Sequence, residues 1–395
     1  MRRPISARWQ VETLALVLLS LQGAYSQTWT PTSAPSKDWF CVASSADGTK
    51  LVAGSGQGQV QPGGLIYIST NSGATWNPST APYAQWMSIA SSADGSRLVA
   101  AARYVSNEFM LFSPGAIYIS TNSGATWQAS STPSGQWFSV ASAPDGTTLA
   151  AAMYKGGIHI STNSGNSWDT SGAPATNWFA VAMSADGTKF VAGSDNAAYI
   201  STDSGSNWTN VLPGASYRHV TCSLDGQKFA ASNGSAIYTS TNSGLNWTLA
   251  NFFLTGSTTS LACSTNGDKL VSASWPGLIL ISTNWGASSY WDGSANINWS
   301  SVATSSDGSK LVATANGNLI YTWRAIPFLT IARSVGDLTV SWRSMSAALG
   351  YELEQNSDLT TTNWLNVGLP VNDDGTNRSV SLAETTSNSF FRLRR

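Results

Sequence analysis

The chain has 395 residues, of which 42% are hydrophobic and 11% aromatic but only 10% charged, whereas an average globular domain is about 25% charged. The formal net charge of −1 argues against a nucleic-acid-binding protein, which would present a basic surface to phosphates. Thirty-five glycines and the lack of long runs of helix-forming residues exclude large helical domains, while 18 tryptophans can supply a packed core. The composition therefore predicts a turn-rich all-β protein.

The N-terminal residues have the pattern of a secretory signal. Arginines precede an apolar run, Leu14–Leu21, and the small residues Ala24 and Ser26 stand at the −3 and −1 positions of a cleavage before Gln27. The alternative is a membrane anchor, but the apolar run is shorter than the ~20 residues that a spanning helix needs. We therefore expect a cleaved signal over residues 1–26 and a secreted or cell-surface protein without a transmembrane segment.

Two short motifs recur along the next 300 or so residues, interleaved with a period of about 41 residues. The first is an Asp-Gly-like turn followed by an apolar strand, centred on Asp47, Asp94, Asp145, Asp186, Asp225, Asn266 and Asp307. The second is Ser-Thr-Asn-Ser-Gly-x-x-Trp, which runs from Ser69 to Trp76, Ser120 to Trp127, Ser161 to Trp168, Ser201 to Trp208 and Ser240 to Trp247, with a degenerate copy from Ser282.

Each repeat divides into four short strands. In the fourth repeat these begin near Trp178, Lys189, Ala198 and Trp208. Four short strands per ~40 residues are typical of a β-propeller blade, which cannot bury both of its faces without neighbours. The seventh repeat lacks a fourth strand, and the segment around Trp29 resembles the segment after Trp76, so we expect it to complete the last blade and close the ring. The sequence predicts a seven-bladed β-propeller over residues 27–324.

The second motif resembles the Asp-box, or BNR repeat, with the pattern Ser-x-Asp-x-Gly-x-x-Trp. The resemblance implies a structural hairpin between the third and fourth strands, away from the ligand-binding face, in which the short polar side chain bonds backbone amides of the turn. It assigns this structural role to Asn71, Trp76, Asn122, Trp127, Asn163, Trp168, Asp203, Trp208, Asn242 and Trp247.

Families with this repeat include sialidases and other glycoside hydrolases, so their catalytic groups are the first candidates for an active site. The resemblance to sialidases implies three arginines and a Tyr–Glu pair, but residues 27–324 contain a single glutamate, Glu108. Most aspartates lie in the repeated turns, and His159 and His219 replace repeat residues in strands, where packing is the expected role. We therefore predict no catalytic residue, no metal site and no cofactor.

The face opposite the repeated turns is where the repeats differ from one another, and rigid scaffolds usually bear their binding residues on such loops. Aromatic side chains with amides and a few charges suit sugar rings, and the candidate ligand-binding residues are Tyr104, Glu108, Phe109, Tyr154, Lys155, Trp275 and Trp291. Ordinary insertions with self-packed aromatics are an equally open interpretation.

An aromatic residue also opens the first strand of most repeats, at Trp39, Trp86, Trp137, Trp178, Tyr217 and Trp299. Packing against small residues of neighbouring blades is favoured over an aromatic ring at the mouth of the propeller. Cys41, Cys222 and Cys263 lie in apolar strands and are expected to be buried, although a bridge between Cys222 and Cys263 stays open.

Residues 325–395 leave the repeat and form a separate pattern of short strands, such as Leu338–Trp342 and Ser379–Leu382. The pattern resembles small fibronectin-III-like modules at the C-termini of secreted bacterial proteins, which implies a spacer, attachment or sorting role.

The sequence as a whole predicts a secreted, non-catalytic binding or surface-interaction protein that recognises an extracellular glycan, or a surface protein, through the loop face. One alternative is a glycoside hydrolase or lyase that uses Glu108 with an unidentified aspartate. Another is a structural subunit of an extracellular assembly. The low charge and the repeat role of most tryptophans weigh against an enzyme.

Overall fold

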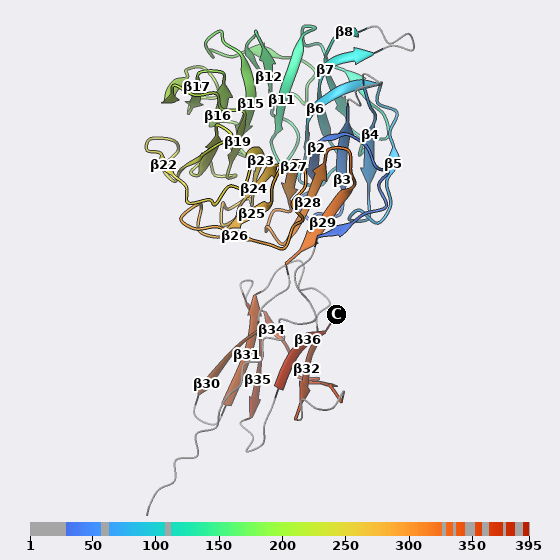
Figure 1. The fold of residues 1–395 in the computed structure, drawn as a ribbon, viewed down its shortest axis with the longest axis vertical. Coiled ribbons are helices and arrows are strands. Elements are labelled where there is room, and N and C mark those ends of the chain that lie inside the picture. The colour runs from blue at the N-terminus through green and yellow to red at the C-terminus, as the bar shows by residue number, and fades with distance from the viewer. Residues whose placement is uncertain are drawn as a thin grey trace, which may run out of the picture.

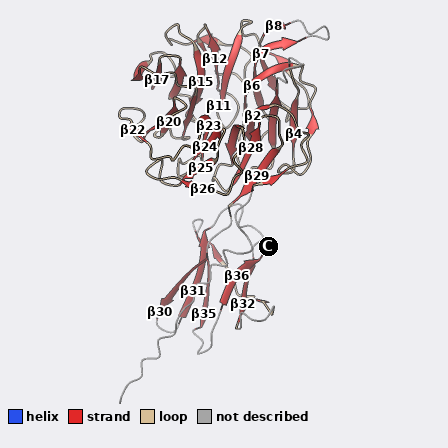
Figure 2. Cartoon of the chain, viewed as in Figure 1, coloured by secondary structure: helices blue, strands red, loops and turns tan. Residues whose placement is uncertain are grey.

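The structure, a computed structural model, describes residues 29–56, 63–106, 112–325, 329–334, 337–343, 352–357, 363–373, 377–383 and 390–394. These residues form strands, turns and loops without a helix (Figure 2), and accordingly none of them belongs to a helix that could cross a membrane. The predicted signal, residues 1–26, lies outside the described residues, as do Glu108 and Phe109.

Residues 30–324 form seven antiparallel sheets, most of which take four strands consecutive in sequence. The first contains β2 (Trp39–Ser44), β3 (Leu51–Ser55), β4 (Ile66–Ser69) and β5 (Asn77–Pro78). The second contains β6 (Ala84–Ser91), β7 (Leu98–Ser106), β8 (Phe112–Pro114), β9 (Ile117–Ser120) and β10 (Gln128–Ala129). The third contains β11 (Gln136–Ser142), β12 (Leu149–Tyr154), β13 (Ile158–Ser161) and β14 (Asp169–Thr170).

The fourth sheet contains β15 (Trp178–Met183), β16 (Phe190–Ser194), β17 (Ala197–Ser201) and β18 (Thr209–Pro213). The fifth contains β19 (His219–Cys222), β20 (Phe229–Ser232), β21 (Ile237–Ser240) and β22 (Thr248–Leu249). The sixth contains β23 (Ser257–Cys263), β24 (Leu270–Trp275), β25 (Ile279–Ser282) and β26 (Tyr290–Trp291). The seventh contains β27 (Trp299–Thr304), β28 (Lys310–Ala315), β29 (Ile320–Arg324) and β1 (Thr30–Pro31).

The sheets stand around a common centre, with their first strands innermost (Figure 1). Contacts run from β2 to β6, β11, β15, β19, β23 and β27 in turn, and β27 contacts β2 again. In the seventh sheet the outer strand comes from the N-terminus, because Thr30 pairs with Thr322 of β29. This is the arrangement of a β-propeller, and the expected completion of the last sheet by the segment around Trp29 agrees with the pairing.

The Asp-Gly turns join the first and second strands of the sheets. Asp186 Oδ1 accepts hydrogen bonds from the Ser184 hydroxyl at 2.5 Å and from the Thr188 N–H at 3.0 Å. The same donors, led by the Ser184 hydroxyl, hold the pKa of Asp186 below its usual value. Gly187 follows with a φ of 67°, which favours glycine. Asp186 is therefore an ionised residue that stabilises its own turn.

The second motif joins the third and fourth strands. Asn71 Oδ1 accepts from the Thr75 N–H at 2.8 Å, and Asp203 Oδ1 accepts from the Asn207 N–H at 2.9 Å, so asparagine and aspartate make the same turn. The degenerate copy keeps the bond, because Asn284 Oδ1 accepts from the Ser288 N–H at 2.9 Å. These contacts stabilise turns at the same edge of the sheets as the Asp-Gly turns.

The residues that open the first strands fill the spaces between sheets. Trp39, Trp86, Trp137, Trp178 and Trp299 are each 0% exposed, and Tyr217 is 3% exposed. They face alanine-rich second strands, in the large-against-small manner of a packed core. The Trp137 ring packs edge-on against His159 with centroids 5.2 Å apart. The packing role is confirmed.

Hydrogen bonds link the Asp-Gly turn of a sheet to the turn of the next sheet at six of the seven junctions. Ala46 N–H donates to Ala93 O, and the pattern continues until Ser306 N–H donates to Ala46 O. Cationic side chains reinforce it: Lys189 Nζ donates to Ser243 Oγ at 3.0 Å in the next sheet. The junction between the third and fourth sheets, here called the third seam, lacks both parts. Pro144 has no N–H to donate, and Thr148 stands where the other six sheets carry lysine or arginine.

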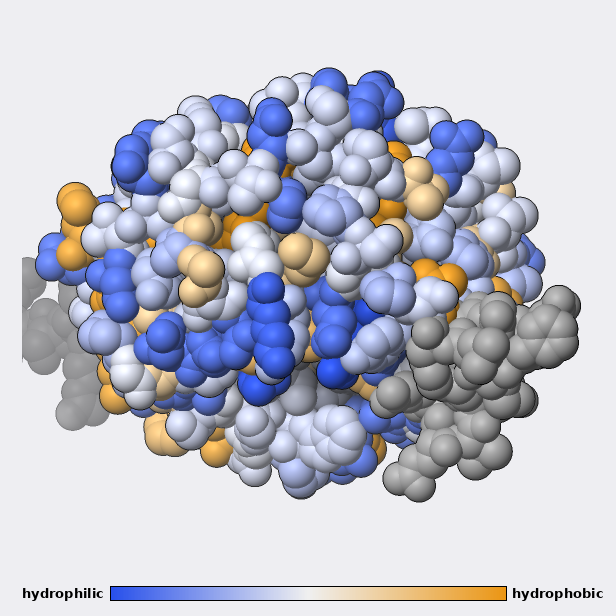
Figure 3. Space-filling view, turned by 90° about the horizontal axis from the view of Figure 1, so that it is seen from above, coloured by the Kyte–Doolittle hydropathy of each residue, from blue (hydrophilic) through white to orange (hydrophobic). Residues whose placement is uncertain are grey.

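The surface seen from above is a mosaic of hydrophilic and near-neutral residues with small, separate hydrophobic areas (Figure 3). Inside, the three cysteines are free thiols. Burial raises the pKa of Cys41 to about 12 and of Cys263 to about 11. Cys263 Sγ donates to Cys222 O at 3.2 Å, so the two cysteines are neighbours without a bridge.

The tail contributes two further sheets below the propeller in Figure 1. One contains β30 (Leu329–Ser334), β31 (Asp337–Arg343), β35 (Asn377–Ala383) and β34 (Asn372–Asp373). The other contains β33 (Leu365–Asn366), β32 (Glu352–Asn356) and β36 (Phe390–Arg394). Val340, Trp342 and Val380 of the first sheet share a buried cluster with Leu353 of the second.

Candidate functional site

The inner strands carry an irregularity at their first residues, opposite the edge with the repeated turns. In the third sheet the register shifts between Trp137 and Ser139, so that Phe138 has no partner in the ladder. Five other sheets shift at the equivalent place, and the fifth sheet begins its ladder one residue after Arg218. The residues at these seven positions, here called the rim positions, are Phe40, Met87, Phe138, Phe179, Arg218, Thr259 and Ser300.

A bulged residue is free of ladder pairing, and bulges are commonly used to re-aim a side chain. None of the seven rim side chains is fully buried, although each follows or precedes a buried residue. The rim positions are therefore the place where the inner strands present side chains instead of packing them.

Aromatic rings gather at the rim of the third and fourth sheets. Phe138 and Phe179 meet edge to face with centroids 5.6 Å apart, although they belong to different sheets. Tyr154, at the end of β12, lies 5.5 Å from Phe138 and 5.9 Å from Phe179. The three rings form one half-buried apolar surface that crosses the third seam.

Three cations border this surface. The Arg103 guanidinium carbon lies 5.2 Å from the centroids of Tyr104 and Phe138, and Arg103 Nε donates to Gln136 Oε1 at 3.2 Å. Arg218 lies 4.1 Å from the Phe179 ring, and Lys155 Nζ lies 5.6 Å from the Tyr154 ring. We call these seven residues the rim cluster: Arg103, Tyr104, Phe138, Tyr154, Lys155, Phe179 and Arg218.

The charges of the rim cluster are not neutralised within the described part of the chain. The ion pairs found there join Lys228 to Asp268 and Arg378 to Asp373, and neither involves the cluster. Guanidinium groups over aromatic faces keep their edge N–H donors available for a further acceptor. The cluster therefore offers anion-binding donors beside an apolar surface.

The backbone at Lys155 has a conformation that is unusual for a lysine. Its φ is 55°, in the left-handed region that disfavours side chains other than glycine. The other non-glycine residues with positive φ in the described chain all lie in copies of the second motif. Lys155 is thus the described positive-φ side chain that lies outside the second motif, in the turn between β12 and β13.

Three of the predicted ligand-binding residues, Tyr104, Tyr154 and Lys155, come together in the rim cluster. Trp275 and Trp291 are exposed on the sixth sheet, outside the cluster. Glu108 and Phe109 lie outside the described residues. The sequence reasoning missed Phe138 and Phe179, whose signal was the bulky residue directly after each buried opening tryptophan.

Neither histidine resembles a catalytic base. His159 is buried against Trp137, and burial lowers its pKa. Burial, together with the nearby Arg218 charge, lowers the pKa of His219 to about 4. Among the residues described, no cluster of His, Cys, Asp or Glu could hold a metal ion. The Asp195 carboxylate, in the loop between β16 and β17, accepts hydrogen bonds from the Thr176 hydroxyl at 2.9 Å and from the Asn177 side-chain amide at 2.5 Å.

Comparison with known proteins finds no matching family model and no matching curated protein. Solved structures do match. The structure of YCF48 bound to D1 peptide has a TM-score of 0.57 and 14% identity, over 77% of this chain and 98% of that one. The β-propeller domain of Cps50 (Swd1) from Myceliophteria thermophila has a TM-score of 0.57 and 13% identity, over 76% of this chain and 100% of that one.

A GH74 xyloglucanase from Xanthomonas campestris matches with the same TM-score of 0.57 and 14% identity. The match covers 80% of this chain and 59% of the xyloglucanase. At these identities the likeness shows the fold alone. Together with the circular order of sheet contacts, it makes residues 30–324 a β-propeller.

Proposed function

We propose that the protein is a secreted, non-catalytic glycan-binding protein whose rim cluster recognises acidic saccharides. The observation that supports this most strongly is the convergence of Arg103, Lys155 and Arg218 on the ring surface of Phe138, Tyr154 and Phe179. Guanidinium and ammonium groups bind carboxylates with charge-assisted hydrogen bonds, while aromatic faces suit the apolar faces of sugar rings. A uronic acid residue carries both chemistries on one ring.

In this proposal the seven sheets are the blades of one closed propeller of the Asp-box type over residues 27–324. Residues 1–26 are its secretory signal, and residues 325–395 are a fibronectin-III-like module. The turn geometry at Asn71 and Asp203 supports the Asp-box assignment, because both side chains accept a hydrogen bond from a backbone N–H of the turn, as expected of that motif.

Binding ranks ahead of hydrolysis on the chemistry of the site. A glycosidase needs two carboxyl groups beside the scissile bond, whereas the rim cluster as described contains cations and rings. The likeness to a xyloglucanase keeps hydrolysis as the alternative. A reducing-end assay on the same saccharides would detect it.

The experiment is calorimetric titration of the protein with an oligogalacturonate and with its carboxyl-reduced, neutral counterpart. We expect the oligogalacturonate alone to bind, with affinity that falls as salt rises. Arg218→Gln should weaken binding about 3- to 10-fold, the range for one partly exposed charged hydrogen bond. Lys37→Gln is a matched control, because Lys37 also lies beside an aromatic ring, 5.7 Å from that of Tyr67 in β4, but is not part of the rim cluster. Equal binding of both saccharides would refute the proposal.

A second candidate is recognition of an acidic peptide. It is favoured by the cations of the rim cluster, which make no ion pair with other described residues, and by the likeness to YCF48, a propeller whose solved structure holds a bound peptide. A glutamate-rich peptide that binds tightly at the rim, where the oligogalacturonate does not, would select it.

A further inference from the structure

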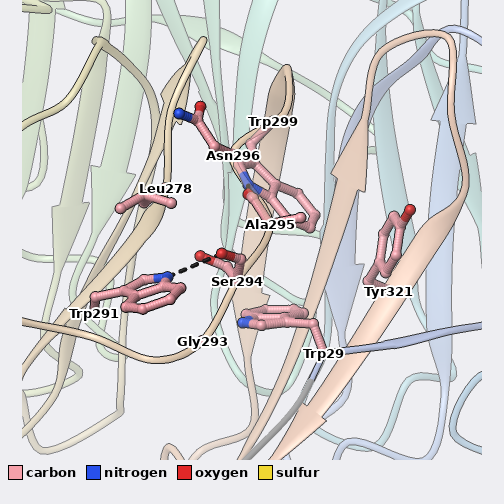
Figure 4. Close-up of a pocket in the computed structure, with 9 residues that line it drawn as sticks. All are labelled: Trp29, Leu278, Trp291, Gly293, Ser294, Ala295, Asn296, Trp299 and Tyr321. Atoms are coloured by element: carbon pink, nitrogen blue, oxygen red, sulfur yellow. Dashed lines mark hydrogen bonds between the residues drawn. The ribbon is translucent and has the colours of Figure 1, made fainter.

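A cavity of about 600 Å³ opens between the sixth and seventh sheets. Its walls include Trp29, Trp291, Trp299 and Tyr321, with Asn296 among the polar lining residues (Figure 4). Two of these walls come from opposite ends of the propeller sequence, because Trp29 precedes β1 and Trp291 lies in β26. The volume is in the usual range for small-molecule sites.

The aromatic walls are fixed by their own polar atoms. Trp29 Nε1 donates to Asp292 Oδ2 at 2.7 Å, Trp291 Nε1 to Ser294 O at 2.9 Å, and Trp299 Nε1 to Ala295 O at 2.9 Å. The rings of Trp29 and Trp299 also pack with centroids 5.6 Å apart. Since each indole N–H is already bonded to the protein, the rings have only apolar faces and C–H edges left for a ligand.

Tyr321 continues the same wall. Its ring meets Trp299 with centroids 5.2 Å apart, and its hydroxyl donates to Asn318 Oδ1 at 3.2 Å. On the opposite side of the cavity, Trp291 is 58% exposed although its indole N–H is hydrogen-bonded to Ser294 O. A tryptophan ring that is fixed by a hydrogen bond and exposed to solvent is a preformed surface for stacking.

The sixth repeat departs from the others at the positions that build this cavity. Ser289 stands where the preceding repeats place the tryptophan of the second motif, and Trp291 stands where the first repeat has Pro78. Asp292 replaces the serine that caps the following turn in the first repeat, Ser79. It keeps that cap through the Ser294 N–H at 3.1 Å and adds the bond to Trp29.

Among the described residues, those that line the cavity include no charged side chain. The Asp292 carboxyl lies behind the wall, 5% exposed, and is occupied by the Trp29 and Ser294 donors. The polar side chain left at the opening is neutral, the exposed amide of Asn296. Charged ligands would lose hydration here without gaining a counter-charge.

We propose that this cavity is a second binding site, for a neutral saccharide that stacks on Trp291 and directs hydroxyl groups to the Asn296 amide. The site is independent of the rim cluster and does not rest on the function proposed for it. Stacking supplies the apolar contact, and the neutral amide supplies donors and an acceptor at the edge.

The test is saturation-transfer NMR and calorimetry with maltose, cellobiose and N,N′-diacetylchitobiose. We expect at least one disaccharide to bind and Trp291→Ala to weaken it at least tenfold. Trp275→Ala is the matched control, since Trp275 is an exposed tryptophan of the same sheet that does not line the cavity. Binding should stay unchanged in Arg218→Gln and should not be displaced by oligogalacturonate.

Circular dichroism and thermal melting of Trp291→Ala establish that the variant is folded. If Trp291→Ala does not fold, Asn296→Ala serves in its place, with an expected loss of about threefold. Failure of all three disaccharides to bind, or binding that survives both substitutions, would overturn the proposal. Loss of binding in Arg218→Gln would assign the saccharide to the rim instead.

Discussion

The third seam is expected to be the weakest junction of the propeller, and Thr148→Lys should strengthen it. Thr148 contacts Gly187 in the place where Lys189 contacts Gly226 one sheet later. Lys189 Nζ reaches Ser243 Oγ, and Ser204 is the equivalent residue for a lysine at position 148, with a φ of 58° against 55° for Ser243. The acceptor is therefore already in place.

The expected gain follows from one charged hydrogen bond at a partly exposed site, about 0.5–1.5 kcal/mol, less the ordering of the lysine side chain. Unfolding about 300 residues carries an entropy of about 0.6 kcal/mol per kelvin. A net gain near 1 kcal/mol would thus raise Tm by about 1–2 °C. Differential scanning calorimetry resolves such a shift.

Two controls make the result decisive. Lys189→Thr should lower Tm by a similar amount, because it removes the bridge from the neighbouring junction. Thr148→Gln lengthens the side chain without the charge and should gain less than lysine. If Thr148→Lys leaves Tm unchanged while Lys189→Thr lowers it, the third seam is not limited by the missing bridge, and the reasoning is refuted.

Three further predictions concern single side chains. Burial raises the pKa of Asp292 from 3.8 to about 6, so this carboxyl stabilises the fold most below pH 4 and loses that contribution, at most about 3 kcal/mol, as pH rises through 6. The turn aspartates, whose pKa values are lowered by hydrogen bonds, act in the opposite direction at acid pH. Between pH 4.5 and 7.5, the urea unfolding free energy of the wild type should therefore fall relative to that of Asp292→Asn. Lys155→Gly should relieve a strained φ and raise the free energy of unfolding by about 1 kcal/mol. The same substitution should weaken oligogalacturonate binding. If wild type and variant bind oligogalacturonate with equal affinity, Lys155 is not part of the site. Cys41 should resist alkylation by iodoacetamide in the native protein at pH 8, because the thiol is buried and burial raises its pKa to about 12. Rapid labelling of Cys41 before the protein unfolds would contradict this.

The fold could be predicted well from the sequence because each repeat contains its own turn motifs, which separate the strands. Apolar runs between Asp-Gly turns and the second motif define strands locally, so the expected strand at Trp178 is β15. The packing role of the opening tryptophans followed from their small alternation partners. The repeated sequence pattern could not show the register shift that follows each opening tryptophan. A strand pattern of alternating buried and exposed residues assumes that every residue is paired in the ladder.

The candidate sites were harder to predict for the same reason. Tyr104, Tyr154 and Lys155 were visible as departures from the repeat, but the bulge that turns Phe138 toward them was not. The bond between Trp29 and Asp292 joins residues 263 positions apart, which come together because the N-terminal strand β1 pairs with β29 of the seventh sheet. A sequence pattern within one repeat cannot predict a contact between residues so far apart in the chain.

The bulge at the start of six of the seven inner strands has a consequence for how this protein could acquire new ligands. The bulged residues Phe40, Met87, Phe138 and Phe179 have no partner in the ladder, so replacing them leaves strand pairing in place. The Thr259 and Ser300 hydroxyls, by contrast, donate to backbone carbonyls at 2.8 and 3.1 Å and hold the scaffold. The seven positions now hold three phenylalanines, a methionine, an arginine, a threonine and a serine. At the four bulged positions with phenylalanine or methionine, specificity and stability are thereby assigned to different residues of the same strand. A library that randomises the codons of Phe40, Met87, Phe138 and Phe179 would vary the recognition surface while strand pairing is kept.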